Sequence, residues 1–138
     1  MAFEFPQKVL FKHCDPAGIV FYPRYFEMLN DCVEAFFDEV LEMPFETLHA
    51  TGGVPTAEIA TRFHRPSRHG DQLLITLAVT RVGRSSAGLS FVAKAGEETR
   101  LTAQSTLVLV TADGRSRPWP DATRQKLLDR EEARSHET

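Results

Sequence analysis

Cysteine is scarce in this sequence of 138 residues, which contains only Cys14 and Cys32. The two are too far apart for the Cys-x-x-Cys spacing typical of a metal site. The sequence leaves open a disulfide between them, although a chain without a secretion signal usually keeps its thiols reduced. We therefore expect no metal centre built on cysteine.

Excess positive charge and long hydrophobic runs are also missing. The chain has 16 Lys and Arg against 19 Asp and Glu, so nothing indicates the basic surface that nucleic-acid binding requires. No apolar run approaches the roughly 20 residues of a transmembrane helix. The first residues lack the charged and apolar regions of a signal peptide. We expect a cytoplasmic protein that binds no nucleic acid and has no membrane span.

Repeats and low-complexity segments are absent as well, and the length predicts a single domain over residues 1–138. Hydrophobic residues make up 42% and charged residues 25%, as in ordinary globular proteins. A domain of this size can bury about 68–70% of its unfolded surface, which is enough for a core without disulfides.

The longest periodic segment predicts a helix from Arg24 to Leu41. Its apolar residues recur at steps of three and four and form one broad stripe, with acidic residues on the other side. Pro44 prevents simple continuation, and Gly52-Gly53 predicts a loop. We expect this helix to lie in the middle of the core.

Strand-like segments lie on both sides of this helix. The first covers residues 3–11. Four alternating segments follow the helix and suit an antiparallel meander joined by short turns, namely residues 57–63, 73–79, 89–93 and 101–109. The charged segment 121–133 predicts a surface helix, and the last residues are expected to be disordered.

These elements predict an α+β fold in which an antiparallel sheet of about five strands wraps around one long central helix. A sheet with one hydrophobic face needs a cover, and only the long helix is apolar enough to supply it. Long edge strands tend to pair with another subunit, so we expect a homodimer or homotetramer.

The segment between the first strand and the helix, FKHCDPAGIVFYPRY, differs from the rest of the chain. It places Asp15 in a turn that contains Pro16 and Gly18. Free N–H groups and the positive end of the helix dipole would stabilise an acid at this point. The same pattern fits a residue that only caps or closes a turn, and the two interpretations remain open.

The run DPAGIVFYPRYF, from Asp15 to Phe26, resembles the signature of hotdog-fold acyl-CoA thioesterases of the 4-hydroxybenzoyl-CoA thioesterase family. That signature is an acid followed by Pro-Ala-Gly-Ile-Val, an aromatic residue, Tyr-Pro, a variable residue and Tyr. Weaker agreement continues to about Val110. The family has the hotdog fold, whose element order is the one predicted above.

The resemblance implies a thioesterase that hydrolyses an acyl-CoA to the free acid and CoA. Asp15 corresponds to the family's carboxylate, which acts as nucleophile or as the base that activates water. The backbone N–H of Tyr22 would face the thioester carbonyl, and Gly18 would let the backbone approach it. CoA is then part of the substrate, and no cofactor or metal is expected.

The resemblance also implies a substrate site shared between subunits, to which the second hotdog strand contributes. Glu58 and, more weakly, Thr61 are candidates there, although Glu58 also fits a solvent-facing position. His13 shares a side with Asp15 if the first strand continues that far, and the alternative is a partly exposed histidine. Arg84 matches one member of the basic cluster that contacts the CoA phosphates.

The match at Arg84 is incomplete, because Gly83 and Ser85 stand where the family is basic. Arg81 and Lys94 are the nearest substitutes. The acyl group is equally open: the resemblance favours an aromatic, hydroxybenzoyl-like group, and a short- or medium-chain aliphatic acyl-CoA or an acyl carrier protein thioester is the nearest alternative.

Other chemistries fit the sequence less well. A Cys14 nucleophile is disfavoured because adjacent residues on an extended segment point to opposite sides, away from His13. No spacing supports a metal site made of His64, His69 and Asp15. A hotdog dehydratase needs a different histidine–acid arrangement, and a purely acyl-CoA-binding domain gains nothing from an extra carboxylate near an anionic ligand.

Overall fold

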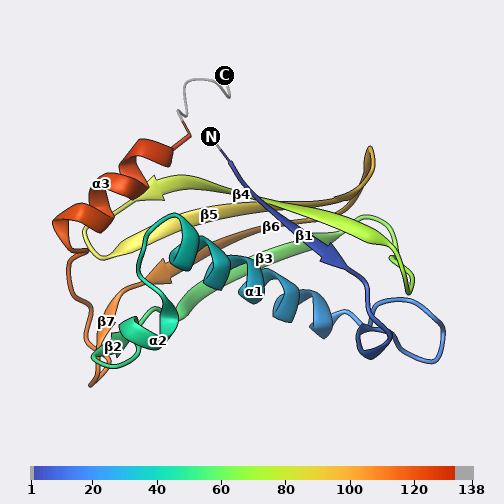
Figure 1. The fold of residues 1–138 in the computed structure, drawn as a ribbon, viewed down its shortest axis with the longest axis horizontal. Coiled ribbons are helices and arrows are strands. Elements are labelled where there is room, and N and C mark those ends of the chain that lie inside the picture. The colour runs from blue at the N-terminus through green and yellow to red at the C-terminus, as the bar shows by residue number, and fades with distance from the viewer. Residues whose placement is uncertain (1, 133–138) are drawn as a thin grey trace.

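A long helix lies across the inner face of a curved antiparallel sheet in the computed structural model, which describes residues 2–132 (Figure 1). The helix, α1 (Pro23–Glu39), begins with proline at its first position, where the missing N–H costs no helical hydrogen bond. Seven of its residues are buried, namely Tyr25, Met28, Leu29, Cys32, Val33, Phe36 and Phe37. The predicted central helix is confirmed.

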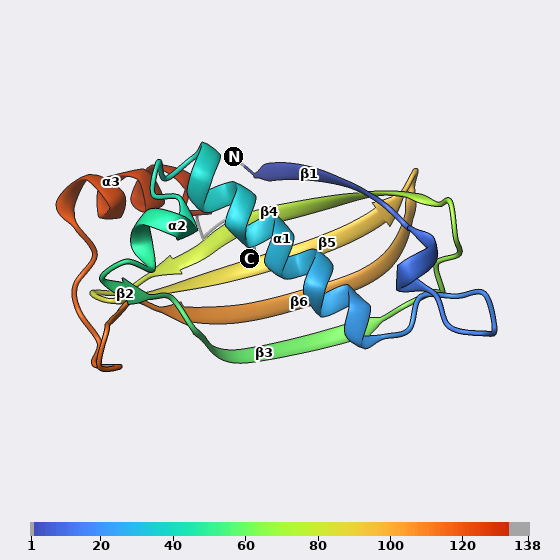
Figure 2. The same cartoon turned by 60° about the horizontal axis from the view of Figure 1, so that its bottom comes forward.

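The sheet has five strands in the order β1-β4-β5-β6-β3, all antiparallel to their neighbours. Their bounds are β1 (Phe3–Lys8), β3 (Thr56–Phe63), β4 (Gln72–Val82), β5 (Ser86–Ala95) and β6 (Glu98–Val108). Figure 2 shows α1 lying over the middle strands with β3 at one edge. The α+β architecture of five strands around one helix agrees with the sequence prediction.

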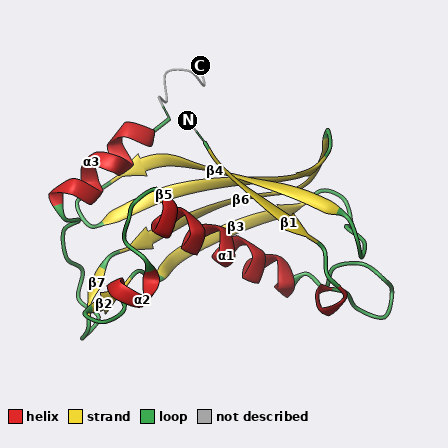
Figure 3. Ribbon diagram, viewed as in Figure 1, coloured by secondary structure: helices red, strands yellow, loops and turns green. Residues whose placement is uncertain are grey.

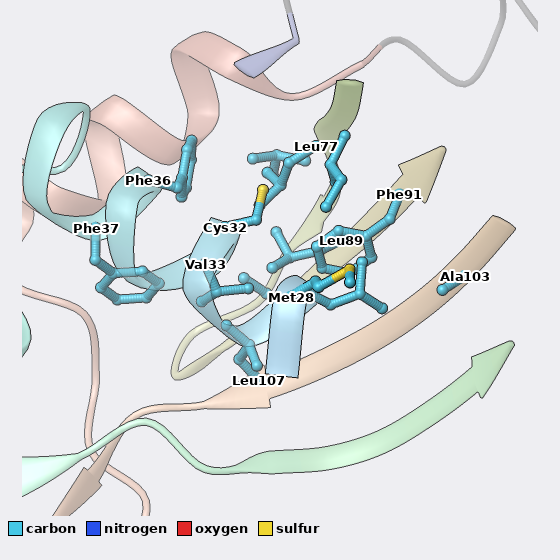
Figure 4. Packing of buried hydrophobic residues seen from close by; sticks show 14 of the residues in the cluster. Met28, Cys32, Val33, Phe36, Phe37, Leu77, Leu89, Phe91, Ala103 and Leu107 are labelled. Carbon is cyan, nitrogen blue, oxygen red and sulfur yellow. The ribbon is translucent and has the colours of Figure 1, made fainter. Parts of the chain in front are cut away.

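The core forms where α1 meets the inward positions of the sheet. Met28, Cys32 and Val33 of the helix lie against side chains of β4, β5 and β6 (Figure 4). Alternate residues of each central strand are buried, as the period-two pattern predicted. This packing fixes the position of the first turn of α1 relative to β3.

The predicted meander is correct only for β4, β5 and β6. β3 does not pair with β4, its successor in the chain; it pairs with β6 at the other side of the sheet. The connection between them, residues 64–71, contains Pro66 and is too long for a tight hairpin turn. This connection lies next to the segment that carries Asp15, and an isolated β-bridge between Ile19 and Arg68 joins the two.

Three short elements that follow α1 were not predicted (Figure 3). The helix α2 (Phe45–Leu48) follows Pro44, and the two-residue strands β2 (Gly52–Gly53) and β7 (Val110–Thr111) pair with each other. Gly52 and Gly53, expected in a loop, therefore belong to a strand. A Cβ at Gly52 would collide with the carbonyl oxygen of Val110, which explains why glycine is needed there.

The C-terminal helix α3 (Asp121–Arg130) is more than a surface helix. Leu127 is buried, and the preceding Trp119 donates its indole N–H to the Ser86 carbonyl at 3.0 Å. After the helix, Glu131 pairs with Val79 where β1 no longer covers β4. The expected end of this helix at Ala133 and the expected disorder beyond it lie outside the described residues.

Candidate active site

The Asp15 loop folds back on itself as a small hairpin. The Gly18 N–H donates to the Asp15 carbonyl at 2.9 Å, and the Asp15 N–H donates to the Ile19 carbonyl at 2.9 Å. Gly18 has a φ of 81°, a conformation that glycine adopts without steric cost. Because its N–H is used within the turn and a Cβ there would meet nothing within 4 Å, the structure gives Gly18 a turn-forming role in this chain.

The Asp15 carboxylate is held by its own loop at one oxygen only. Its Oδ1 accepts the Ala17 N–H at 2.9 Å, which is the local turn that aspartate commonly makes. Its Oδ2 has no hydrogen-bond partner among residues 2–132, and the side chain is partly exposed. The turn role left open by the sequence is therefore real, and it leaves one oxygen available.

The hairpin leads directly into the first turn of α1. The Arg24 and Tyr25 amides donate to the Phe21 and Tyr22 carbonyls at 2.8 and 3.1 Å, and Pro23 has no N–H. The Tyr22 amide has no acceptor in the described part of the chain. Tyr22 is thus a residue at which this helix start offers a free backbone donor.

His13 is buried in the short 3-10 helix Phe11–His13, where the sequence had predicted strand. Its Nδ1 accepts the Leu10 N–H at 2.9 Å, so the neutral ring carries its proton on Nε2. Burial lowers the pKa of His13, and the charge of Lys12 lowers it further. Neither the extended conformation nor the partly exposed histidine considered from sequence is observed.

Both cysteines are free thiols. The Cys14 thiol contacts the Leu10 carbonyl at 3.7 Å, while Nδ1 of the adjacent His13 accepts the Leu10 N–H. Cys32 lies in the core, and burial raises its pKa to about 12. At neutral pH Cys32 is therefore an uncharged packing residue.

Arg100, which the sequence analysis did not single out, holds the segment that pairs with the Asp15 loop. Arg100 Nη1 donates to Asp71 Oδ2 at 2.7 Å, to Ser67 Oγ at 3.1 Å and to the Pro66 carbonyl at 3.2 Å. The Ser67 carbonyl in turn accepts the Val20 N–H at 2.8 Å. Arg100 had no distinguishing signal in the sequence, because it occupies an outward position of an alternating strand.

A cavity of about 600 Å³ lies between α1 and β3. Phe26 and Ile59 line the end near the first turn of α1, while Phe45 and His49 line the other end. Most of the lining is apolar. Asp15 does not line this cavity, and the first residue of α1 that does is Phe26, one helical turn after Tyr22.

The strand β3 presents two different faces. Thr61 pairs with Ala103 on the face toward α1, and its hydroxyl is buried without a hydrogen-bond partner among residues 2–132. Glu58 pairs with Thr106 on the outer face and is exposed. Within one chain the structure therefore brings Thr61, but not Glu58, to the side of the sheet on which α1 begins.

Arg84 lies in the turn between β4 and β5, at the opposite end of the sheet from the Asp15 loop (Figure 2). Its carbonyl accepts the Trp119 N–H at 3.0 Å. Arg81 is at that same end, whereas Lys94 is near the end that carries the loop. One chain therefore does not bring Arg84 and Asp15 together.

Comparison of the sequence with models of protein families shows which family it belongs to. The model of the thioesterase-like superfamily matches residues 9–127, which is most of the chain. This chain belongs to that superfamily. The predicted resemblance and the predicted class of enzyme, a thioester hydrolase, are confirmed at this level. A search of the curated proteins finds no match for this thioesterase.

Solved structures share the fold of this thioesterase at low identity. A 1,4-dihydroxy-2-naphthoyl-CoA thioesterase from Synechocystis is 18% identical, with a TM-score of 0.85 over 94% of this chain and 97% of that one. The dynemicin thioesterase is 14% identical, with a TM-score of 0.88 over 96% and 99%. A 4-hydroxybenzoyl-CoA thioesterase is 21% identical, with a TM-score of 0.82 over 91% and 98%. The hotdog fold is confirmed.

Two further expectations concern membranes and metals. Within residues 2–132 no helix is both long and apolar enough to cross a membrane. His64, considered for a metal site, contacts the Thr102 hydroxyl through Nε2 at 2.9 Å, and His69 lies against the exposed ring of Phe11. Each of these two histidines thus has a local contact of its own.

Proposed function

We propose that this thioesterase hydrolyses acyl-CoA esters, with Asp15 as the catalytic carboxylate and the Tyr22 N–H as the donor to the thioester oxygen. One observation carries the proposal. Ala17 fixes one carboxylate oxygen and leaves the other free, in a hairpin that runs directly into a helix start with an unpaired amide. A positioned base and an unpaired donor are the two groups that acyl transfer to water needs.

The chemistry requires only groups of this chain and water. Asp15 takes a proton from water as the water oxygen bonds to the thioester carbon, and negative charge develops on the carbonyl oxygen at the Tyr22 amide. When the carbonyl re-forms, the C–S bond breaks and CoA leaves as the thiol after receiving that proton. Alternatively, Asp15 attacks the carbon itself and water then hydrolyses the resulting anhydride, which gives the same products.

The names of the structural relatives suggest two kinds of acyl group. Two of those described above are named for aromatic acyl-CoA esters, and the dynemicin thioesterase was crystallised with a polyene. An aromatic acyl-CoA and an extended aliphatic one are therefore both within the proposal. The polyene binding of the dynemicin thioesterase is the specific observation that favours an extended aliphatic acyl group.

A thiol-release assay over a panel of acyl-CoA esters tests the function. The panel contains acetyl, butyryl, octanoyl, dodecanoyl, benzoyl and 4-hydroxybenzoyl esters, and the same acyl groups on an acyl carrier protein. Release of free CoA from at least one ester, at a rate proportional to enzyme, is the expected result. Tight binding of the esters without release of thiol would instead identify a binding domain and refute the proposal.

We also propose that the working unit is a dimer joined through the outer edge of β3. This eight-residue strand ends the sheet, and almost all of its side chains are exposed in the single chain. An open edge of this length is a template for another strand. Glu58 and Arg84, both remote from Asp15 in one chain, remain candidates only for contacts to substrate bound to another copy.

A further inference from the structure

We infer, on the basis of the proposed function, that Ser67 is a positioning residue for the reaction. It holds the Asp15 hairpin and the first turn of α1 to each other, and it thereby sets where the Asp15 carboxylate lies relative to the Tyr22 amide. Ser67 is fully buried, at 0% exposure, in a connection whose other residues are mostly exposed. A hydroxyl that is buried in this way needs hydrogen-bond partners, and its partners are the reason for the proposed role.

The backbone of Ser67 and its neighbour pairs with the Asp15 hairpin. The Ser67 carbonyl accepts the Val20 N–H at 2.8 Å, and the β-bridge between Ile19 and Arg68 lies next to this bond. The Ile19 carbonyl in turn accepts the Asp15 N–H at 2.9 Å. Two consecutive residues of the hairpin are thus held by the connection, and one of them bonds directly to Asp15. A movement of Ser67 therefore displaces the side of the hairpin that faces Asp15.

The side chain of Ser67 meets the first turn of α1 at Tyr25. The Tyr25 phenol oxygen is buried and makes no hydrogen bond of regular geometry among residues 2–132. Burial raises the pKa of Tyr25, and Ser67 partly opposes this rise, so the two residues are neighbours. The Tyr25 N–H donates to the Tyr22 carbonyl at 3.1 Å. Tyr25 therefore connects Ser67 to the turn that carries the Tyr22 amide.

Arg100 orients the Ser67 hydroxyl. Its Nη1 donates to Ser67 Oγ at 3.1 Å, and a guanidinium cannot accept a hydrogen bond in return. The hydroxyl proton of Ser67 is therefore left for another acceptor, and the neighbouring phenol oxygen of Tyr25 is without a partner. The Arg100 carbonyl also accepts the His64 N–H at 2.8 Å, so the start of the connection is held by the same residue. Ser67 thus sits on a braced support.

The Asp15 hairpin and the start of α1 need a common support because each carries one of the two groups of the proposed reaction. The carboxylate belongs to the hairpin, and the free amide belongs to the helix start. A displacement of about 1 Å in an active site can lower the rate about 10²-fold. Sites are precise where packing and hydrogen bonds lock the residues that support them. The contacts of Ser67 to both segments provide such a lock.

Two variants remove the contact from opposite sides and keep the backbone. Tyr25→Phe deletes the phenol oxygen, and Ser67→Ala deletes the hydroxyl but retains the carbonyl that holds Val20. On the ester of the panel that is hydrolysed fastest, each should lower kcat about tenfold, because the carboxylate and the amide are no longer aligned. KM and the Kd of the non-hydrolysable S-butyl-CoA thioether should change less than about twofold, since no group that touches the substrate is removed.

Thr123→Val is the matched control for these two variants. It removes a buried hydroxyl from α3, which lies at the other end of the sheet from the Asp15 hairpin (Figure 1), and it should keep the wild-type kcat. If Ser67→Ala folds poorly, Tyr25→Phe remains informative, because it removes a buried oxygen that has no regular hydrogen bond to lose. A wild-type kcat in Tyr25→Phe would overturn the positioning role.

Combination with Asp15→Asn separates positioning from a general loss of stability. If Ser67 acts by placing the carboxylate, Tyr25→Phe should lower kcat about tenfold in the wild type but less than about twofold in Asp15→Asn, which has no base left to place. Equal losses in the two backgrounds would mean that the contact only stabilises the fold, and they would overturn the inference.

Nuclear magnetic resonance of the whole protein provides a readout that does not depend on turnover. The Ala17 and Val20 amides report on the hairpin, at the Asp15 carboxylate and at Ser67. Tyr25→Phe, although it lies on α1, should shift both amide signals and speed hydrogen exchange at Val20, and unshifted signals would overturn the inference. Shifted signals in a protein that hydrolyses no ester of the panel would leave the link through Ser67 standing and refute only the proposed function.

Discussion

His13 illustrates how a residue next to the proposed catalytic acid differs from its sequence interpretation. Alternation along an extended segment placed it on the same side as Asp15, but the chain turns at Phe11 and buries the imidazole. Its ring accepts a backbone N–H, and its own carbonyl accepts the Phe21 N–H at 2.9 Å, which closes the hairpin around Asp15. Sequence periodicity does not reveal such a short turn, because only three residues take part.

The buried His13 predicts a loss of stability in mild acid. Its folded pKa lies below the unfolded value of 6.5, because burial and then Lys12 disfavour the charged ring. At a pH between these two pKa values the unfolded chain binds more protons at His13 than the folded protein does. The contribution of the buried neutral ring to the free energy of unfolding is therefore fully present above pH 6.5, and it falls as the pH drops below that value. His13→Gln should reduce the difference in unfolding free energy between pH 7.5 and 5.5, measured by urea titration.

The same substitution at the exposed His69 is the control for this titration. If His69→Gln reduces the pH dependence as much as His13→Gln does, burial of the ring is not its source. The comparison is clean because both changes remove one imidazole and introduce one neutral amide.

The sequence pointed to Asp15 as a candidate catalytic residue, but it did not predict the hydrogen bonds of its side chain. The acid, the proline and the glycine indicated a turn, and the resemblance indicated a carboxylate with a catalytic role. The sequence could not show that Ala17 would occupy only one oxygen, because that depends on the turn geometry. Nor could it show that Gly18 uses its N–H inside the turn.

At the scale of elements, hydrophobic periodicity predicted most of the fold. The inward residues of β4, β5 and β6 and the apolar stripe of α1 are regular over many residues, so their pattern is clear. The order of β3 in the sheet depends on the path of residues 64–71, for which no periodicity exists. The short elements α2, β2 and β7 contain too few residues to establish a period.

The path of residues 64–71 depends on Arg100, whose side chain is 13% exposed and has three hydrogen-bond acceptors there. We expect Arg100→Met to lower the free energy of unfolding by about 2–3 kcal/mol, since hydrogen bonds to charged groups contribute about 1.5–3 kcal/mol. It should also speed hydrogen exchange at the Val20 amide, which donates to the Ser67 carbonyl. Denaturation and exchange measured by NMR provide the two readouts.

Arg65→Met is the matched control, because Arg65 is exposed and its Nε lies 3.6 Å from Glu98. It should cost less than about 1 kcal/mol and leave Val20 exchange unchanged. The cost of Arg100→Met should shrink in acid. The Arg68 N–H and then Arg100 hold the pKa of Asp71 below 3.8, and the stability they provide through this carboxylate is lost as the pH falls through the lowered value. An equal effect of both variants would exclude the anchoring role.

For the whole molecule, the unpaired edge of β3 predicts a dimer. Sedimentation should give twice the mass of one chain, or a multiple of that. Ala60→Lys puts a charge on this exposed strand and, in a two-fold dimer, brings two like charges close together, so the dimer should dissociate at least tenfold more readily. Gln7→Lys on β1, at the opposite edge of the sheet, should have no such effect.

A dimer that resists Ala60→Lys but dissociates with Gln7→Lys would move the interface to β1. A strictly monomeric wild type with full thioesterase activity would contradict a shared site altogether. In that case Glu58 and Arg84 would lose the second copy that their proposed contacts require.

The central claim is that Asp15 is the catalytic carboxylate, and the turnover of Asp15→Asn tests it most directly. Asparagine still accepts the Ala17 N–H through its amide oxygen, so the hairpin is expected to persist with an unchanged melting temperature. The account predicts that kcat falls by about 10²–10⁴, the usual contribution of a general base. The exposed turn acid Asp113, changed to asparagine, is the control and should keep full activity. An Asp15→Asn enzyme with kcat within a factor of three of the wild type would contradict the claim.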